Sequence, residues 1–310
     1  MTIIILRVDS RQDRLARPGI ILTVINPSYM SKILVPCDFS GQSMDAFRFA
    51  LELAKAEQDQ IELLHVIELP VLNDTTLMPT LSFEAEYMKE AAEQAKRNFQ
   101  RMIKPVKKKL AMTWSVEYGN PASTILFHSK KKKSDLIVMG TKGASGLKEY
   151  FVGSNTEKIV RQSPVPVVAV PAGVSVASLK NIIFPTLLIG DNDTLMNEVK
   201  ELQETLQARL HVVFINTPAW FRRDRESQEL LEKFAKRHKL SRHTLNVYND
   251  ISEEEGIVNF ASRVKSCMVV MGTHGRRGIG HLLTGSVTED VVNHIKFPVW
   301  TFRTGRKAKG

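Results

Sequence analysis

The amino-acid sequence repeats one glycine pattern in two places, MGTKGASGLKEYFVGSN at residues 139–155 and MGTHGRRGIGHLLTGSV at residues 271–287. Each copy reads Met-Gly, two residues, Gly, nine residues and Gly-Ser. Glycine loses more backbone entropy on folding than any other residue, so its repeated use at fixed spacing needs a physical reason. Free backbone N–H groups at the start of a helix are well suited to bind phosphate. The two patterns, here named the glycine frames, therefore predict a cradle for nucleotide phosphates.

A glycine-rich loop between a strand and a helix is often only a tight turn, and one copy would leave the two interpretations balanced. Two copies, each after a matching strand and before a matching helix, favour a binding site. Other nucleotide and hydrolase motifs are absent from the sequence: GxxxxGKS/T, a GxGxxG after a first strand, HExxH and GxSxG. Their absence argues against a P-loop NTPase and a Rossmann dehydrogenase.

The elements that must position the frames also occur twice, in the same order. Each predicted strand is a short run rich in Val, Ile and Leu, as in strands buried on both faces of a parallel sheet. Strands alternate with helical segments, which predicts an α/β fold with a doubly wound parallel sheet in each half. The matching strands are 32–40 with 181–189, 62–70 with 211–218, 134–140 with 266–272, and 165–171 with 297–303.

Helix periodicity and capping signals support this order. Apolar residues at i, i+3, i+4 and i+7 or similar spacing predict one buried stripe per helix. Asn120 before Pro121, and Ser252 three residues before Glu255, predict helix starts. The predicted stripes contain Phe47, Ala50, Leu51 and Ala54 in the first half, and Leu195, Val199, Leu202 and Leu206 in the second.

Composition limits the class of protein. The chain has 310 residues, which favours two domains, with 43% hydrophobic and 25% charged residues. The formal charge of +10 suits anionic ligands, but no aromatic residues interleave with the lysine runs, so nucleic-acid binding is not expected. No apolar run is long enough to span a bilayer, so no membrane partner is expected. Cys37 and Cys267 lack metal-ligand spacing and are expected to pack as apolar residues in a reducing cytoplasm.

We expect residues 30–173 and 178–305 to form the two domains. Residues 1–29 are expected to be an N-terminal extension outside the fold, and 306–310 a basic tail. The first unit is longer than the second by roughly 17 residues, which are expected after its second strand. This insertion could be a lid or a partner surface, although a plain loop with an elongated helix is the simpler interpretation.

Together, the frames and the duplicated strands resemble the universal stress protein family in its tandem, ATP-binding form. The resemblance implies two tandem Rossmann-like (adenine nucleotide alpha-hydrolase-like) domains, each a five-stranded parallel sheet with helices on both faces. It also implies ATP, with or without Mg²⁺, as the ligand. For the first domain it implies contacts on the phosphate side from Gly143, Gly153, Ser154, Asn155 and Thr156, and on the adenosine side from Pro36, Asp38, Val66, Met139 and Gly140.

The second domain departs from this pattern. Leu187 stands where the first domain has Asp38, and Ile215 stands where it has Val66. Loss of the carboxylate would cost roughly 1–3 kcal/mol of binding free energy, so the second domain is expected to bind ATP weakly or not at all. The residues that the resemblance still implies there are Gly272, Gly275, Gly285, Ser286 and Thr288.

Three functions remain open. The first is an ATP-binding regulatory protein of stress tolerance, with weak hydrolysis at most, since no general base, arginine clamp or metal ligand is evident at the frames. The second is an adenylating enzyme, disfavoured because FSGQSMD at 39–45 lacks the second glycine of an SGGxDS loop. The third is an ATP-independent interaction module. The resemblance also implies that the final strands of the halves, at 165–171 and 297–303, pair within the chain as a pseudo-dimer, with a homodimer left open. His65, His211 and His274 are expected to have no chemical role.

Overall fold

The computed structural model describes residues 2–3, 24–25, 31–54, 58–68, 81–107, 109–141, 153–188, 193–274, 285–294 and 296–304. In the segment 1–29, two short strands, β1 (Thr2–Ile3) and β2 (Val24–Ile25), pair antiparallel in a sheet of their own. The rest of that predicted extension, and the basic tail, lie outside the described residues.

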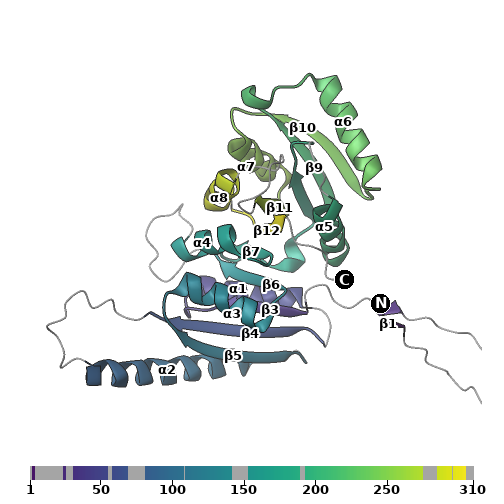
Figure 1. Ribbon diagram of the computed structural model, residues 1–310. Helices are drawn as coiled ribbons and strands as arrows, with labels where there is room; N and C mark the ends of the chain where they lie inside the picture. Colours follow the sequence, from purple (N-terminus) through teal and green to yellow (C-terminus); the bar gives the residue numbers. More distant parts are fainter. Residues whose placement is uncertain are drawn as a thin grey trace, which may run out of the picture.

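The remaining strands form one ten-stranded sheet in the order β10-β9-β8-β11-β12-β7-β6-β3-β4-β5 (Figure 1). All neighbours within each half are parallel, which confirms the predicted duplication of a five-stranded parallel unit. The first half contains β3 (Lys32–Pro36), β4 (Gln60–Ile67), β5 (Ala111–Tyr118), β6 (Leu136–Gly140) and β7 (Val167–Val170). The second contains β8 (Asn181–Pro185), β9 (Arg209–Asn216), β10 (His243–Asn249), β11 (Cys267–His274) and β12 (Val299–Thr304).

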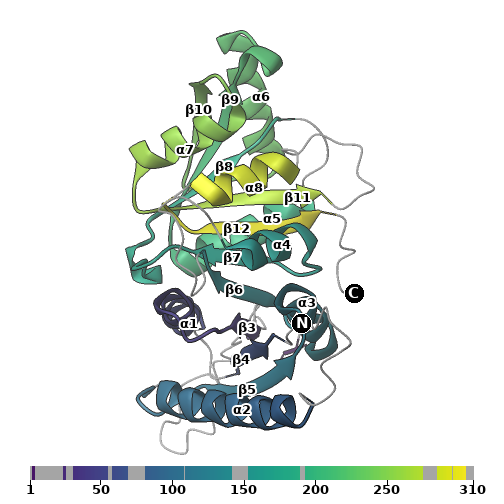
Figure 2. The ribbon, with the colours of Figure 1, turned by 90° about the vertical axis from the view of Figure 1, so that its left-hand side faces the viewer.

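The two halves meet where β7 pairs antiparallel with β12, which confirms the predicted pairing of the final strands within one chain. Trp300 lies opposite Val168 in this pairing, and the Thr301 hydroxyl donates to the Val167 carbonyl at 3.2 Å. Figure 2 shows the strands running without a break from one half into the other. Because backbone hydrogen bonds cross the junction, the halves form a single sheet rather than two domains joined only by a linker.

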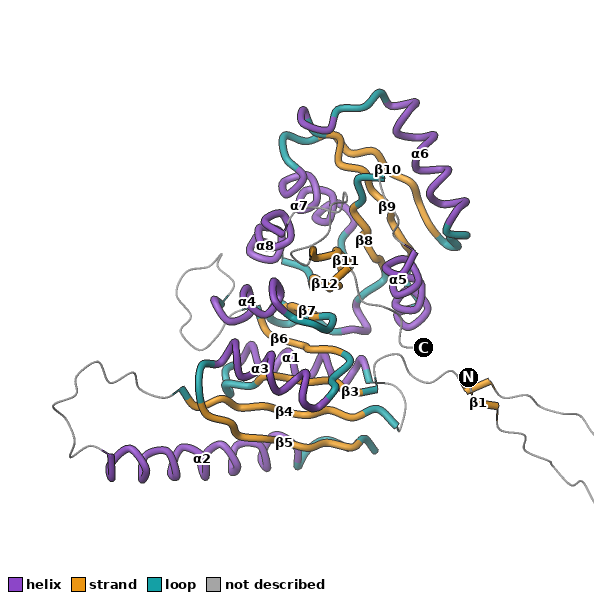
Figure 3. The backbone as a smooth tube through the Cα atoms, viewed as in Figure 1, coloured by secondary structure: helices purple, strands orange, loops and turns teal. Residues whose placement is uncertain are grey.

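Helices cover both faces of this sheet (Figure 3). Each of the two apolar cores contains residues of both halves. One face packs against α1 (Gly41–Leu53), α2 (Leu81–Ile103), α5 (Asp193–Leu206) and α6 (Asp224–Arg237). The other packs against α3 (Pro121–Lys132), α4 (Ser154–Gln162), α7 (Glu253–Val264) and α8 (Gly285–His294). Short 3₁₀ turns occur at Val176–Ser178 and Pro218–Trp220. Within the described part of the chain, no helix is both long and apolar enough to cross a bilayer.

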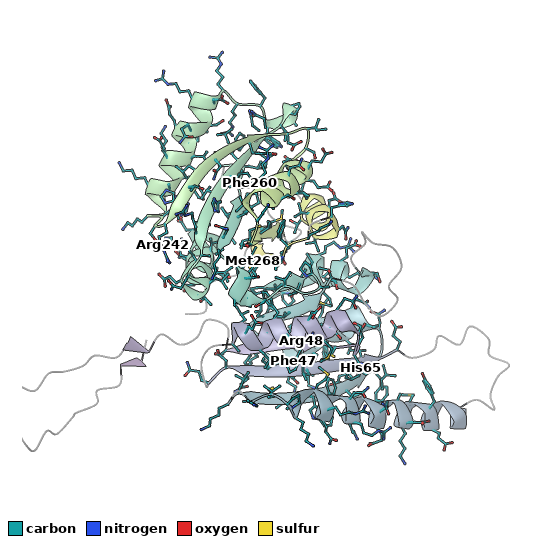
Figure 4. The ribbon with its side chains drawn as sticks, turned by 180° about the vertical axis from the view of Figure 1, so that it is seen from behind. Phe47, Arg48, His65, Arg242, Phe260 and Met268 are labelled. Atoms are coloured by element: carbon teal, nitrogen blue, oxygen red, sulfur yellow. The ribbon has the colours of Figure 1, made fainter. Side chains whose placement is uncertain are left out.

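Local sequence signals account for these elements. On α1, Phe47 is buried in the core whereas the adjacent Arg48 is exposed (Figure 4). The Asn120 side chain caps α3 by accepting from the Ser123 N–H, and the Ser252 side chain caps α7. The helix after β4 is elongated as predicted, since α2 has 23 residues and its counterpart α6 has 14. Residues 69–80, the rest of the predicted insertion, lie outside the described residues.

A polar cluster fastens α3 to the edge of the sheet. The His128 side chain is only 2% exposed, with Nε2 2.8 Å from Glu62 Oε1 and Nδ1 3.4 Å from Glu117 Oε1. The Ser115 hydroxyl donates to the same Glu62 oxygen, and Lys132 Nζ lies 3.6 Å from it. Burial alone raises the pKa of Glu62, but the hydrogen bond and charge of His128, with Ser115 and Lys132, bring it below the ordinary value of 4.5.

Replacing His128 with leucine is expected to lower the free energy of unfolding at pH 7 by about 1–3 kcal/mol, because Glu62 loses a hydrogen-bond partner. A carboxyl whose pKa is lowered by folding stabilises the fold above its unfolded pKa, and this contribution is lost as the pH falls through the folded value. Urea unfolding of the wild-type chain should therefore show this loss below the ordinary value of 4.5. The variant should decline less steeply over the same range, and identical profiles for the two chains would contradict this assignment.

Candidate functional site

The strand order of the first half reverses between β3 and β6, so the helices that follow these strands leave on opposite faces. Ligands of open α/β sheets bind beyond the carboxyl ends of the strands at such a point. A pocket of about 490 Å³ lies there, between the ends of β3, β4 and β6 and the starts of α3 and α4. Its volume falls within the range of roughly 300–1,000 Å³ that is usual for small-molecule sites.

The structure brings to the walls of this pocket every predicted first-domain residue that it describes: Pro36, Asp38, Val66, Met139, Gly140, Gly153, Ser154, Asn155 and Thr156. Gly143 lies outside the described residues. The walls also include Tyr87 of α2 and Pro121 and Ile125 of α3, which were not predicted as site residues. The first turn of α3 could have been foreseen, because it follows β5 at the same edge of the sheet. Tyr87 could not, since only the packing of α2 brings it there.

The end of β3 is held by a short polar network. Asp38 Oδ1 accepts from the Ser40 N–H at 3.0 Å and from the Ser40 hydroxyl at 2.6 Å. Ser40 in turn caps α1, because its Oγ accepts from the Ser43 N–H at 3.3 Å. The Asp38 carboxylate is therefore held in place at the mouth of the pocket.

His65 belongs to the pocket wall, although the sequence indicated only a packing role. It lies on β4 (Figure 4), with Nδ1 2.8 Å from the Cys37 carbonyl oxygen and its ring 4.8 Å from that of Phe39. Because the carbonyl only accepts, this nitrogen carries the proton. Cys37 itself points into the core as predicted, with Sγ 3.5 Å from Ser43 Oγ, and burial raises the pKa of its thiol. Burial also raises the pKa of Cys267, to about 12, so both thiols favour the unreactive protonated form.

The first turn of α4 supplies N–H groups. Gly153 occupies the N-cap position without a side-chain cap, and its own N–H donates to the Thr141 carbonyl at 2.7 Å. The N–H groups of Ser154, Asn155 and Thr156 have no acceptor within an α-helix, and the helix dipole favours an anion beside them. The Thr156 hydroxyl donates to the Gly140 carbonyl at 3.0 Å, which ties the first turn of α4 to the end of β6.

The glycine pattern indicated that Gly140 belongs to a phosphate cradle, but the structure gives another reason for a glycine at this position. A Cβ atom at this position would lie 2.7 Å from the Gln42 carbonyl oxygen and 2.9 Å from its carbonyl carbon. The first turn of α1 thus approaches β6 so closely that only glycine fits. The residue lines the pocket, but the close approach that requires it is between two parts of the protein.

The equivalent place in the second half is apolar. β8 ends at Pro185 as β3 ends at Pro36, so Leu187 occupies the position of Asp38. Leu187 is 6% exposed and lies in one buried cluster with Ile215, Met271 and Ile257. A carboxylate at this position would be placed in an apolar cluster.

The second glycine frame is only partly described. Gly272 lies in β11, and Gly285 and Ser286 begin α8. Thr288 is fully buried, and its hydroxyl has no hydrogen-bond partner among the described residues, unlike that of Thr156. Gly275 and His274's side chain lie outside what the structure describes. The described part of the frame therefore retains a helix start, whereas the positions of Asp38 and Val66 are taken by the buried apolar residues Leu187 and Ile215.

A family model and two relatives of this chain indicate one family. The model of the universal stress protein family matches residues 30–171 and again residues 179–303. Universal stress protein YxiE of Bacillus subtilis is 33% identical over 145 residues, which are 45% of this chain and 98% of YxiE. A universal stress protein of Mycolicibacterium smegmatis is 23% identical over 289 residues, covering 87% of this chain and 96% of the relative. The crystal structure of a universal stress protein from Archaeoglobus fulgidus superposes with a TM-score of 0.66 at 18% identity, covering 89% of this chain and 99% of that one.

Proposed function

The chain belongs to the universal stress protein family, as two tandem domains, and from this we propose that it is an ATP-binding regulatory protein with a role in stress tolerance. The first domain holds the nucleotide. The supporting observation is that a single pocket at the reversal of strand order is lined by all the described residues that the family resemblance implies for ATP. Two free, buried cysteines are compatible with a cytoplasmic protein.

The donor set of the pocket fits an adenine nucleotide. Pro36, Val66 and Met139 offer apolar surface to the base, and the Asp38 carboxylate accepts hydrogen bonds from ribose hydroxyls. The α4 N-terminus at Gly153 and Ser154 offers N–H donors and a partial positive charge to the phosphates. The apolar surface with its carboxylate acceptor and the N–H donors thus come from different elements, the strand ends and the α4 N-terminus, as a nucleotide requires.

Mg²⁺ would enter with the phosphates. Among the described residues, no group of three His, Cys, Asp or Glu side chains could hold a metal ion. Mg²⁺ commonly keeps several waters and binds through substrate phosphates, so this donor set is compatible with Mg²⁺–ATP. Asp38 lies on the adenosine side, so hydrolysis is not part of the proposed function.

The second domain is proposed to bind ATP weakly or not at all. Gly272, Gly285 and Ser286 keep the frame, but the buried apolar residues Leu187 and Ile215 stand at the positions of Asp38 and Val66. The asymmetry predicts at most one tightly bound nucleotide per chain.

Release of the bound ligand tests this function directly. The full chain is purified without added nucleotide and denatured, and the supernatant is analysed by ion-exchange chromatography and mass spectrometry. We expect an adenine nucleotide, and a rise in Tm of the nucleotide-free chain on adding ATP, which stabilises by about 2.7 kcal/mol at 100 times Kd. A chain that carries no nucleotide and gains no thermal stability from millimolar ATP would instead support the ATP-independent interaction module.

A further inference from the structure

A second hollow lies in the second domain, at the carboxyl ends of β9 and β10, and none of the described residues of the glycine frame lines it. It has a volume of about 780 Å³ and is open to solvent. Its walls come from the loop between β9 and α6 and from the end of β10, and include Asn216, Phe221, Arg222, Arg223, Asn249 and Asp250. We name it the arginine–aromatic hollow.

The loop that forms this hollow is held rigidly by one buried side chain. Asn216 Oδ1 accepts from the Arg222 N–H at 2.9 Å, while its Nδ2 donates to Asn249 Oδ1 at 2.9 Å and to the Arg222 carbonyl at 3.3 Å. Thr217 caps the 3₁₀ turn by accepting from the Trp220 N–H. A loop fixed in this way has little conformational entropy left to lose on binding.

This rigid loop presents large apolar side chains to solvent. Phe221 is 72% exposed and Trp220 is 39% exposed. Ile251, directly after Asp250 of the hollow, is also 72% exposed. These are three of the six large exposed hydrophobic side chains in the described part of the chain, so half of them gather at one place.

The helix that follows Ile251 does not cover its side chain. Ile251 precedes the N-cap residue Ser252 of α7, a position whose apolar side chain often packs against the fourth helical residue. Here that residue is Gly256, which offers no side chain. Glycine is required there because a Cβ atom would overlap the Ile215 side chain. Packing in the core of the domain thus leaves Ile251 uncovered beside the hollow.

The walls of the hollow carry charges of both signs, with Arg222 and Arg223 beside Asp224 and Asp250. The Arg222 guanidinium lies 5.4 Å from the centre of the Phe214 ring, which orients it. Within the described ranges, neither Arg222 nor Arg223 forms an ion pair with a carboxylate, whereas Arg225 pairs with Glu229 at 3.1 Å. Both Asp250 oxygens already accept hydrogen bonds, from the Ile251 N–H and from the Asn259 amide. The two arginines are therefore available to an acidic ligand.

We propose that the arginine–aromatic hollow binds a short acidic peptide segment of a partner protein. An apolar side chain of the segment packs against Trp220, Phe221 and Ile251, and its carboxylates pair with Arg222 and Arg223. Tryptophan and arginine are enriched at the residues that dominate protein–protein binding. Ile251 is aliphatic and cannot stack on a nucleobase, which favours a peptide over a single-stranded nucleic acid. This site is independent of ATP binding by the first domain.

Selection from a library of random 16-residue peptides displayed on phage, panned against the full chain, tests this proposal. Enriched peptides should carry a large aliphatic or aromatic residue flanked by Asp or Glu. A synthetic, fluorescein-labelled copy of the most enriched peptide is then titrated by fluorescence anisotropy. Phe221→Ala should weaken its binding at least tenfold. Arg223→Gln should weaken it severalfold and reduce its dependence on salt.

Phe127→Ala is the matched control, because Phe127 is 66% exposed on α3 of the other domain, and it should change Kd less than twofold. Tm values show that each variant is folded. The proposal is overturned if no acidic peptide is enriched, or if Phe221→Ala binds the peptide as tightly as wild type. It is equally overturned if a labelled 20-mer oligothymidylate displaces the peptide and binds more tightly than it does, which would assign the surface to nucleic acid.

Discussion

Replacing Leu187 with aspartate is expected to lower the free energy of unfolding by about 3–5 kcal/mol, the largest effect among the substitutions considered. The substitution restores at this position the residue type that the first domain carries as Asp38. Leu187 is 6% exposed and belongs to the same buried apolar cluster as Ile215, Ile257 and Met271, so burying the new carboxylate there carries a large desolvation cost. Urea unfolding followed by circular dichroism measures the loss.

Leu187→Met is the matched control, because it keeps an apolar side chain of similar volume and should cost less than about 1.5 kcal/mol. Burial raises the pKa of a carboxyl, so the deficit of Leu187→Asp should shrink as the pH is lowered. A variant as stable as wild type, or one that gains ATP affinity in the second domain, would show that this region is an open pocket after all.

Replacing Asp38 with leucine is expected to weaken ATP binding by about ten- to a hundredfold while leaving the chain folded. The carboxylate lies at the mouth of the pocket and is solvent-exposed, so its loss removes a hydrogen-bond acceptor without opening a cavity in the core. A hydrogen bond from a ligand hydroxyl to a charged group contributes about 1–3 kcal/mol. Isothermal titration calorimetry of the nucleotide-free chain gives the change in Kd.

Asp38→Asn should fall between wild type and Asp38→Leu, because the amide oxygen still accepts but carries no charge. Glu229→Gln, which removes a carboxylate on α6 of the other domain, should leave ATP affinity unchanged. If Asp38→Leu binds ATP as well as wild type does, the assignment of the adenosine side to the end of β3 is wrong.

The fold could be predicted almost completely from the sequence, because the same order of strand and helix patterns occurs in both halves of the chain. Buried Val- and Ile-rich strands, apolar helical stripes and the caps at Asn120 and Ser252 all indicate the same α/β unit, and the structure confirms them. Pairing of the final strands was predicted from the resemblance to the family and is confirmed at Trp300 and Val168.

The site was only partly accessible to sequence reasoning. The resemblance to the family implies Pro36, Val66 and Gly140 as site residues, and their place agrees with the rule that ligands bind at the carboxyl ends of strands. It cannot show that Gly140 serves the approach of α1, or that the Thr156 hydroxyl is used within the protein. These facts depend on the distance between elements, which spacing along the chain does not contain.

Clusters of side chains from distant segments could not be predicted either, because spacing along the chain does not show which elements lie close together. His128 lies far along the chain from Glu62, and neither has a motif around it. The arginine–aromatic hollow was also missed, because Trp220, Phe221 and Ile251 read as ordinary apolar residues until their exposure is known.

The antiparallel junction of β7 with β12 has a consequence for how the two halves can diverge. In an assembly of identical subunits, every substitution appears in both subunits. The two copies therefore cannot carry different residues at the same position. Joining both copies in one polypeptide removes that constraint, and it also makes their association insensitive to dilution. One copy can then keep a polar residue at the end of its first strand while the other exchanges it for a leucine that strengthens its core. The junction of β7 with β12 thus allows the two halves to take different functions, which two identical separate chains could not do.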